Sequence, residues 1–156
     1  MGLKYLTKLN VMNRIFELLS LKVEMSLEFV EFSFITLENI LTVKENRVTF
    51  LSNNFMKLTL KYLKGGTSSQ TKCSICMILS RVDEEFSGNK TEPNKKSIDQ
   101  IINLINTQKN EKVKHTAIFS LLIIVQRGKL QFEGYFFKQQ KFFFFQQKKI
   151  LIILVN

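Results

Sequence analysis

The chain has 156 residues, of which 45% are hydrophobic, and carries a formal net charge of +10. This length suits one domain with its own core, and six Gly and one Pro are too few for collagen, a turn-rich β-sandwich or a disordered chain. No apolar run approaches the roughly 18 residues of a membrane span, and no signal-peptide core opens the chain. We therefore expect a cytoplasmic protein, with the nucleus as the alternative location.

Six stretches carry apolar residues at the spacing of three and four that one face of a helix requires. Polar or small breaks separate them, including Gly65 and Gly66 and a polar segment over residues 83–96, which we predict to be a long loop. Side chains suited to N-caps precede four of the stretches: Ser26, one of Thr67, Ser68 and Ser69, Ser97, and Asn110. The pattern predicts an all-α protein with helices over residues 3–22, 26–43, 47–63, from about 69 to 82, from about 98 to 105, and 110–127.

The C-terminal end has a different character. Residues 127–156 contain six Lys or Arg and one Glu, and their runs of Phe, Gln and Lys keep neither a helical nor a strand period. We predict two parts: a helical domain over residues 1–128 and a basic tail over residues 129–156 that lies outside the core. Basic segments with aromatic residues bind nucleic acid or anionic membranes, which is the alternative function that we expect for the tail.

The helices repeat when the chain is shifted by 42 residues. Three columns of residues show it: positions 37, 79 and 121 are all Leu, positions 40, 82 and 124 are Ile, Val and Ile, and positions 33, 75 and 117 are Ser, Ile and Ala. In the preceding helices, positions 18, 60 and 102 and positions 21, 63 and 105 both read Leu, Leu and Ile. All of these columns are predicted to point inward, so the helices form three antiparallel pairs.

The segment from Glu45 to Leu63 resembles the start of an armadillo repeat, where a short first helix leads to a longer second one. The segments 72–79 and 113–122 resemble its third helix, with Ala117 in the small-residue position. The resemblance to the armadillo/HEAT family covers residues 3–128 and implies a right-handed α-solenoid-like array of antiparallel helices with about three repeats of 42 residues. Asn53 stands where the family has glycine, so armadillo, HEAT and a plain bundle stay alternatives.

This resemblance implies a non-enzymatic scaffold for protein–protein interaction, and with only three repeats the chain fits a fragment of a longer solenoid. The third helices would line a groove, with an acidic end and apolar side chains beyond it. Such a groove suits another protein or a basic peptide segment with an apolar anchor. The groove residues, taken opposite the core stripe, are Glu28, Glu31, Glu38, Cys73, Met77, Lys112, His115 and Phe119.

Catalytic and metal chemistry are not expected. Cys73 and Cys76 are the only cysteines and His115 the only histidine, whereas a structural zinc site needs four such ligands. No acid or nucleophile is predicted beside His115. We expect neither a cofactor nor a small-molecule substrate.

Overall fold

The computed structural model describes residues 10–21, 24–53, 55–86 and 92–127. Over these ranges the chain forms seven α-helices and no strand, so the predicted all-α class is confirmed. Residues 3–9 of the first predicted helix and the basic tail 129–156 lie outside the described residues. The helices are α2 (Val11–Ser20), α3 (Leu27–Ile40), α4 (Lys44–Ser52), α5 (Phe55–Lys64), α6 (Ser69–Phe86), α7 (Glu92–Thr107) and α8 (Glu111–Arg127).

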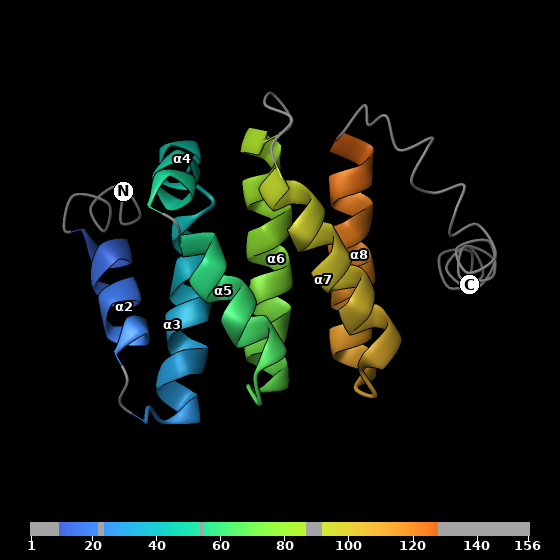
Figure 1. The fold of residues 1–156 in the computed structure, drawn as a ribbon, viewed down its shortest axis with the longest axis horizontal. Helices are drawn as coiled ribbons and strands as arrows, with labels where there is room; N and C mark the ends of the chain where they lie inside the picture. Colours follow the sequence, from blue (N-terminus) through green and yellow to red (C-terminus); the bar gives the residue numbers. More distant parts are fainter. Residues whose placement is uncertain (1–9, 22–23, 54, 87–91, 128–156) are drawn as a thin grey trace.

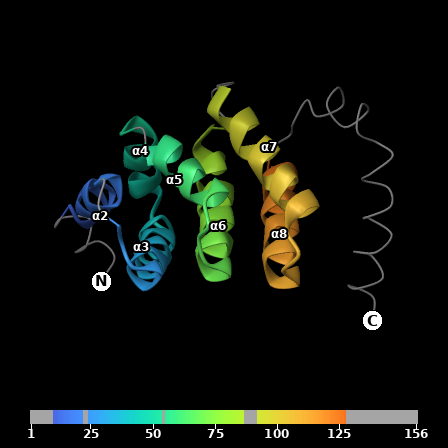
Figure 2. The same cartoon turned by 60° about the horizontal axis from the view of Figure 1, so that its bottom comes forward.

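The helices form two layers. One layer consists of α3, α6 and α8, which lie side by side with α6 in the middle (Figure 1). The other layer contains α2, α4, α5 and α7, and the turned view separates it clearly from the first (Figure 2). In Figure 1, α5 crosses over the junction of α3 with α6, and α7 crosses over the junction of α6 with α8.

Each helix of the first layer begins with the same capping geometry. The Oγ atoms of Ser26 and Ser68 accept hydrogen bonds from the N–H groups three residues later, at 3.2 Å and 3.1 Å. Asn110 Oδ1 accepts the N–H of Val113 at 3.2 Å. A cap of this kind satisfies one of the backbone donors that a helix start leaves unpaired. The caps predicted at Ser26 and Asn110 are confirmed, Ser68 is the cap of the middle helix, and successive caps lie 42 residues apart.

The core lies between the two layers and follows the same register. Leu37, Leu79 and Leu121 are 0%, 1% and 2% exposed. The column of Ile40, Val82 and Ile124 is equally buried, and Ala117 allows close approach at 0% exposure. The inward positions predicted for these three helices are therefore confirmed.

Helix α2 departs from this register. Leu18 and Leu21, predicted to point inward, are 44% and 54% exposed, whereas Phe16 and Leu19 are buried. The ring of Phe16 stacks on the ring of Phe55 with centroids 3.8 Å apart. Burial of the large aromatic side chain of Phe16 contributes more to stability than burial of Leu18 would, so α2 is rotated relative to the prediction.

The single helix predicted over residues 47–63 is wrong, because the chain forms α4 and α5 in its place. Asn53 ends α4: its backbone N–H and its Nδ2 both donate to the carbonyl of Thr49, at 3.2 Å and 3.0 Å. A side chain that bonds the last carbonyls of a helix in this way competes with continuation of the helix. At the other end of α4, the buried Asn46 donates from Nδ2 to the carbonyl of Ile40 at 2.9 Å.

The long loop predicted over residues 83–96 is also wrong in extent. Helix α6 continues to Phe86 and α7 already begins at Glu92. Neither glycine nor proline interrupts residues 83–86, and Pro93 is tolerated because it lies in the first turn of α7, where its missing N–H costs no hydrogen bond. Ser97, predicted to be a cap, is a buried residue inside α7 whose hydroxyl lies 3.6 Å from Met56 Sδ.

Hydrogen bonds between different helices join residues about 42 positions apart. Their separations in the sequence run from 37 to 44 residues. They join α2 to α5, α3 to α6, α5 to α7 and α6 to α8. The residue pairs are Leu19 with Tyr62, Glu31 with Ser68, Glu38 with Arg81, Met56 with Ser97, Ser69 with Asn110, Gln70 with Lys112, Cys73 with Lys112, and Cys76 with Ser120.

Candidate functional site

All predicted groove residues except Cys73 belong to the side of α3, α6 and α8 that faces away from the other layer, which we name the outer face. Glu28, Gln70 and Lys112 occupy equivalent positions on the three helices. They lie on the opposite side of each helix from the core leucines 37, 79 and 121. Lys112 Nζ donates a hydrogen bond of 2.8 Å to Gln70 Oε1, so α6 and α8 are linked on the outer face.

The three glutamates of α3 are not equivalent. Glu28 is exposed. Glu31 is half-buried and accepts a 2.6 Å hydrogen bond from the Ser68 hydroxyl, which leaves its negative charge in place. Glu38 forms an ion pair of 3.5 Å with Arg81, which also donates to the Glu38 carbonyl at 3.2 Å. Glu38 therefore does not contribute a free carboxylate to the acidic end of the groove expected from the sequence, because α6 brings a cation beside it.

Cys73 does not lie on the surface. It is 5% exposed, and its sulfur lies 3.9 Å from the carbonyl oxygen of Lys112. Helix α8 packs over this position, which shares its register with Glu31 and His115. The neighbouring Cys76 is 0% exposed, and burial raises the pKa of its thiol to about 12, with a smaller contribution from Cys73. Both thiols are free and belong to the core, so the groove assignment of Cys73 is wrong.

Met77 and Phe119 supply the apolar part of the outer face. Met77 is half-buried, with its sulfur 4.0 Å from the Ser120 hydroxyl, while Phe119 is 55% exposed. Met77 also lines a cavity of about 240 Å³ that the sequence does not indicate, because three stretches distant in the sequence build it. Its other lining residues are Thr42, Arg47, Ser80, Arg81 and Ile123.

Lys112 and His115 are exposed on α8. His115 Nε2 lies 3.8 Å from Glu111 Oε2, and both side chains are about two-thirds exposed, at 64% and 66%. Pairs exposed to this extent contribute little stability because water screens them. In the described part of the chain, no group of three or more His, Cys, Asp and Glu residues could hold a metal ion.

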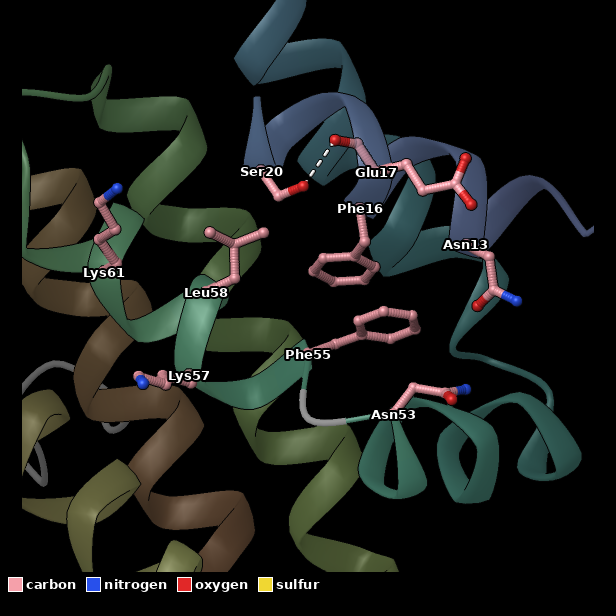
Figure 3. Close-up of a pocket in the computed structure, with 9 residues that line it drawn as sticks. All are labelled: Asn13, Phe16, Glu17, Ser20, Asn53, Phe55, Lys57, Leu58 and Lys61. Carbon is pink, nitrogen blue, oxygen red and sulfur yellow. Dashed lines mark hydrogen bonds between the residues drawn. The ribbon is translucent and has the colours of Figure 1, made fainter. Parts of the chain in front are cut away.

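A larger cavity of about 680 Å³ opens between α2 and α5. Figure 3 shows the rings of Phe16 and Phe55 facing each other inside it, with Glu17 and Ser20 on the α2 side and two lysines on the α5 side. Glu17 is paired with Arg14 at 2.8 Å. The cavity offers an aromatic surface with charges of both signs at its rim. Its lining residues are Asn13, Phe16, Glu17, Ser20, Asn53, Phe55, Lys57, Leu58 and Lys61.

The sequence offered no signal for this second cavity. It depends on the rotation of α2 and on the break at Asn53, and neither follows from the apolar periodicity. Within the described residues, no helix combines the length and the apolar character that crossing a bilayer demands.

Comparisons with known proteins assign the chain to no family. No protein-family model, no curated protein and no solved structure matches it. A proposal of function therefore depends on the geometry of the outer face and of the two cavities.

Proposed function

We propose that the chain is a non-enzymatic helical-repeat scaffold of the armadillo/HEAT type that binds another protein along the outer face of α3, α6 and α8. One observation carries the proposal: the capping side chains of these helices lie 42 residues apart, and the core leucines keep the same spacing. In such an array each repeat contacts mainly its neighbours, and successive repeats present equivalent faces to one ligand.

The chemistry of the outer face suits a peptide segment with basic residues and an apolar anchor. Glu28 and Glu31 place negative charge on α3, where a Lys or Arg side chain of a partner would find an acceptor. Met77 and the cavity beside it lie one helix further along the array. An extended chain that crosses the helices would meet the carboxylates first and the apolar position next.

Binding of labelled peptides, measured by fluorescence anisotropy, tests the proposal. The probes are a set of peptides of about 15 residues, each with two Lys or Arg residues and one Phe or Leu, and an acidic counterpart of each. We expect basic peptides to bind more tightly than acidic ones, and salt to weaken the binding.

Two variants locate the binding site. Glu31→Gln keeps an oxygen that can accept the Ser68 hydroxyl but removes the charge, and Met77→Ala removes the apolar anchor point. Each should weaken peptide binding by roughly three- to tenfold, and Glu31→Gln should also flatten its salt dependence. Glu45→Gln, on the exposed part of α4, is the matched control and should bind like the parent. Equal affinity of all variants, or of basic and acidic peptides, would overturn the proposal.

A further inference from the structure

The hydrogen bonds of α6 reveal which sides of these helices face a neighbour. Toward α3, Ser68 and Arg81 bond to Glu31 and Glu38. Toward α8, the Cys76 carbonyl accepts the Ser120 hydroxyl, and the sulfur of Cys73 lies near the Lys112 carbonyl. The middle helix thus has a neighbour on both sides. Helices α3 and α8 lie at opposite ends of the layer (Figure 1).

The 42-residue register identifies the open side of α8. The positions equivalent to Cys73, Cys76 and Met77, which contact α8 or lie beside it, are His115, Ile118 and Phe119. We name these three residues the C-terminal edge. Cys73 and Cys76 are almost fully buried, but the His115 side chain is 64% exposed and Phe119 is 55% exposed. The edge is therefore built like a helix junction but has no neighbouring helix among the described residues.

The same register identifies the open side of α3. Thr71 and Ser74 lie on the side of α6 that also carries Arg81, at helical spacings of three and seven, and they are 0% and 1% exposed. Their counterparts on α3 are Phe29 and Phe32, which are 38% and 68% exposed. We name these two residues the N-terminal edge. The two exposed phenylalanines of α3 thus stand at positions whose equivalents on α6 are buried.

We propose that the C-terminal edge of one copy of the chain docks against the N-terminal edge of a second copy, so that α8 and α3 of the next copy continue the array head to tail. Charge complementarity selects this occupant. At the α6–α8 junction, Gln70 lies opposite Lys112 at 2.8 Å. The same register at the new junction places Lys112 of one copy in the position of Gln70 and Glu28 of the next copy in the position of Lys112, so opposite charges face each other there.

This contact joins two different surfaces, so each copy keeps one edge open for another copy. Heterologous contacts of this kind form rings when the rotation closes and open chains when it does not. Assembly should therefore increase with concentration and should not stop at a dimer unless a ring closes. The contact uses the two ends of the layer, whereas Glu31 and Met77, which test the peptide site, are not part of it.

Sedimentation equilibrium of the full chain over about 1 to 200 µM tests the proposal. Lys112→Glu and Glu28→Lys each place like charges opposite each other and should weaken association on the order of tenfold. Phe119→Ala should weaken it by roughly thirtyfold. Glu45→Lys makes the same charge change on α4, away from both edges, and should associate like the parent.

Mixing the two charge variants separates this contact from unspecific attraction. An equimolar mixture of Lys112→Glu with Glu28→Lys restores opposite charges at every mixed junction, so association should return toward the parental level. The double variant should also associate. A parent chain that stays monomeric at every concentration overturns the proposal. This holds whether both edges are exposed in the monomer or the residues after Arg127 cover α8. Single variants that assemble like the parent, or a mixture that fails to recover, overturn it as well.

Discussion

Leu121 shows how one residue reports on the core. It is 2% exposed at the centre of α8, and truncation to alanine should lower the free energy of unfolding by about 2 to 5 kcal/mol, because a cavity replaces its contacts. Leu18 is the matched control: it is 44% exposed, and Leu18→Ala should cost less than about 1 kcal/mol. Urea denaturation of the two variants measures the difference.

The comparison of these two leucines also tests the rotation of α2. Both residues belong to columns that the sequence predicts to point inward, but the structure buries only Leu121. Equal losses of stability in the two variants would show that α2 keeps the predicted phase.

The Cys76 thiol links stability to pH. Burial raises its pKa to about 12 from the ordinary value of 9.0, which the unfolded chain retains. Above pH 9 the unfolded chain releases this proton while the native protein keeps it. Stability due to this thiol is therefore fully present below pH 9 and is lost as the pH rises toward 12, by up to about 1.4 kcal/mol per pH unit.

Removing the thiol tests this linkage. Cys76→Ala should be less stable than the parent at neutral pH, because the buried sulfur loses its contacts. The gap in unfolding free energy should narrow between about pH 9 and pH 11, since only the parent loses the thiol contribution. Urea denaturation of both proteins at each pH measures it. A gap that stays constant across this range would show that the thiol titrates alike in both states.

At the scale of single helices, the N-cap of α8 gives a direct test. Asn110→Ala removes the acceptor of the Val113 N–H and should cost about 1 kcal/mol. Asn103→Ala is the matched control, because Asn103 is exposed inside α7, where alanine is the better helix former. It should leave stability within about 0.5 kcal/mol of the parent. Thermal unfolding followed by circular dichroism measures both, and equal effects would contradict the capping role of Asn110.

Helix boundaries were predicted well where a cap determines them and poorly where a tertiary contact does. The starts of α3, α6 and α8 follow from Ser26, Ser68 and Asn110, whose side chains bond within their own helices. The end of α4 is also local, because Asn53 bonds to Thr49 four residues earlier, but the continuous apolar period over residues 47–63 hides it. The placement of Ser97 inside α7 depends on burial beside Met56, which is distant in the sequence. Local sequence carries the first kind of information but not the second.

At the scale of the whole molecule, stability should be highest in α6, the middle helix of its layer. Helix α6 packs along α3 and α8 and also contacts α4, α5 and α7, whereas the shorter α2 packs against α3 and α5 and touches α4 through Phe16 and Phe50. Opening of α2 exposes less apolar surface, so its amide hydrogens should exchange through local unfolding. Native-state hydrogen exchange should therefore find the slowest amides in α6 and faster ones in α2. Equal protection of the two helices would indicate one cooperative unit.

The sequence by itself determined the all-α class, the caps Ser26 and Asn110, and the columns of buried residues at 37, 79 and 121 and at 40, 82 and 124. For α6 it narrowed the cap to three neighbouring residues, of which Ser68 is the one used. These features are local, because a cap bonds within four residues and a core stripe follows from the helical period. It also predicted most of the outer face, since Glu28, Lys112, His115 and Phe119 are exposed as their phase requires.

Only the tertiary structure decided how neighbouring helices share these residues. It buried Cys73 beneath α8, neutralised Glu38 with Arg81 from 43 residues away, and rotated α2 to stack Phe16 on Phe55. It also revealed the two open edges, because the exposure of Phe32 and Phe119 depends on the absence of a neighbouring helix among the described residues. The helical period determines on which side of its own helix a residue lies. Packing between helices determines whether that side faces water, a cation or another helix.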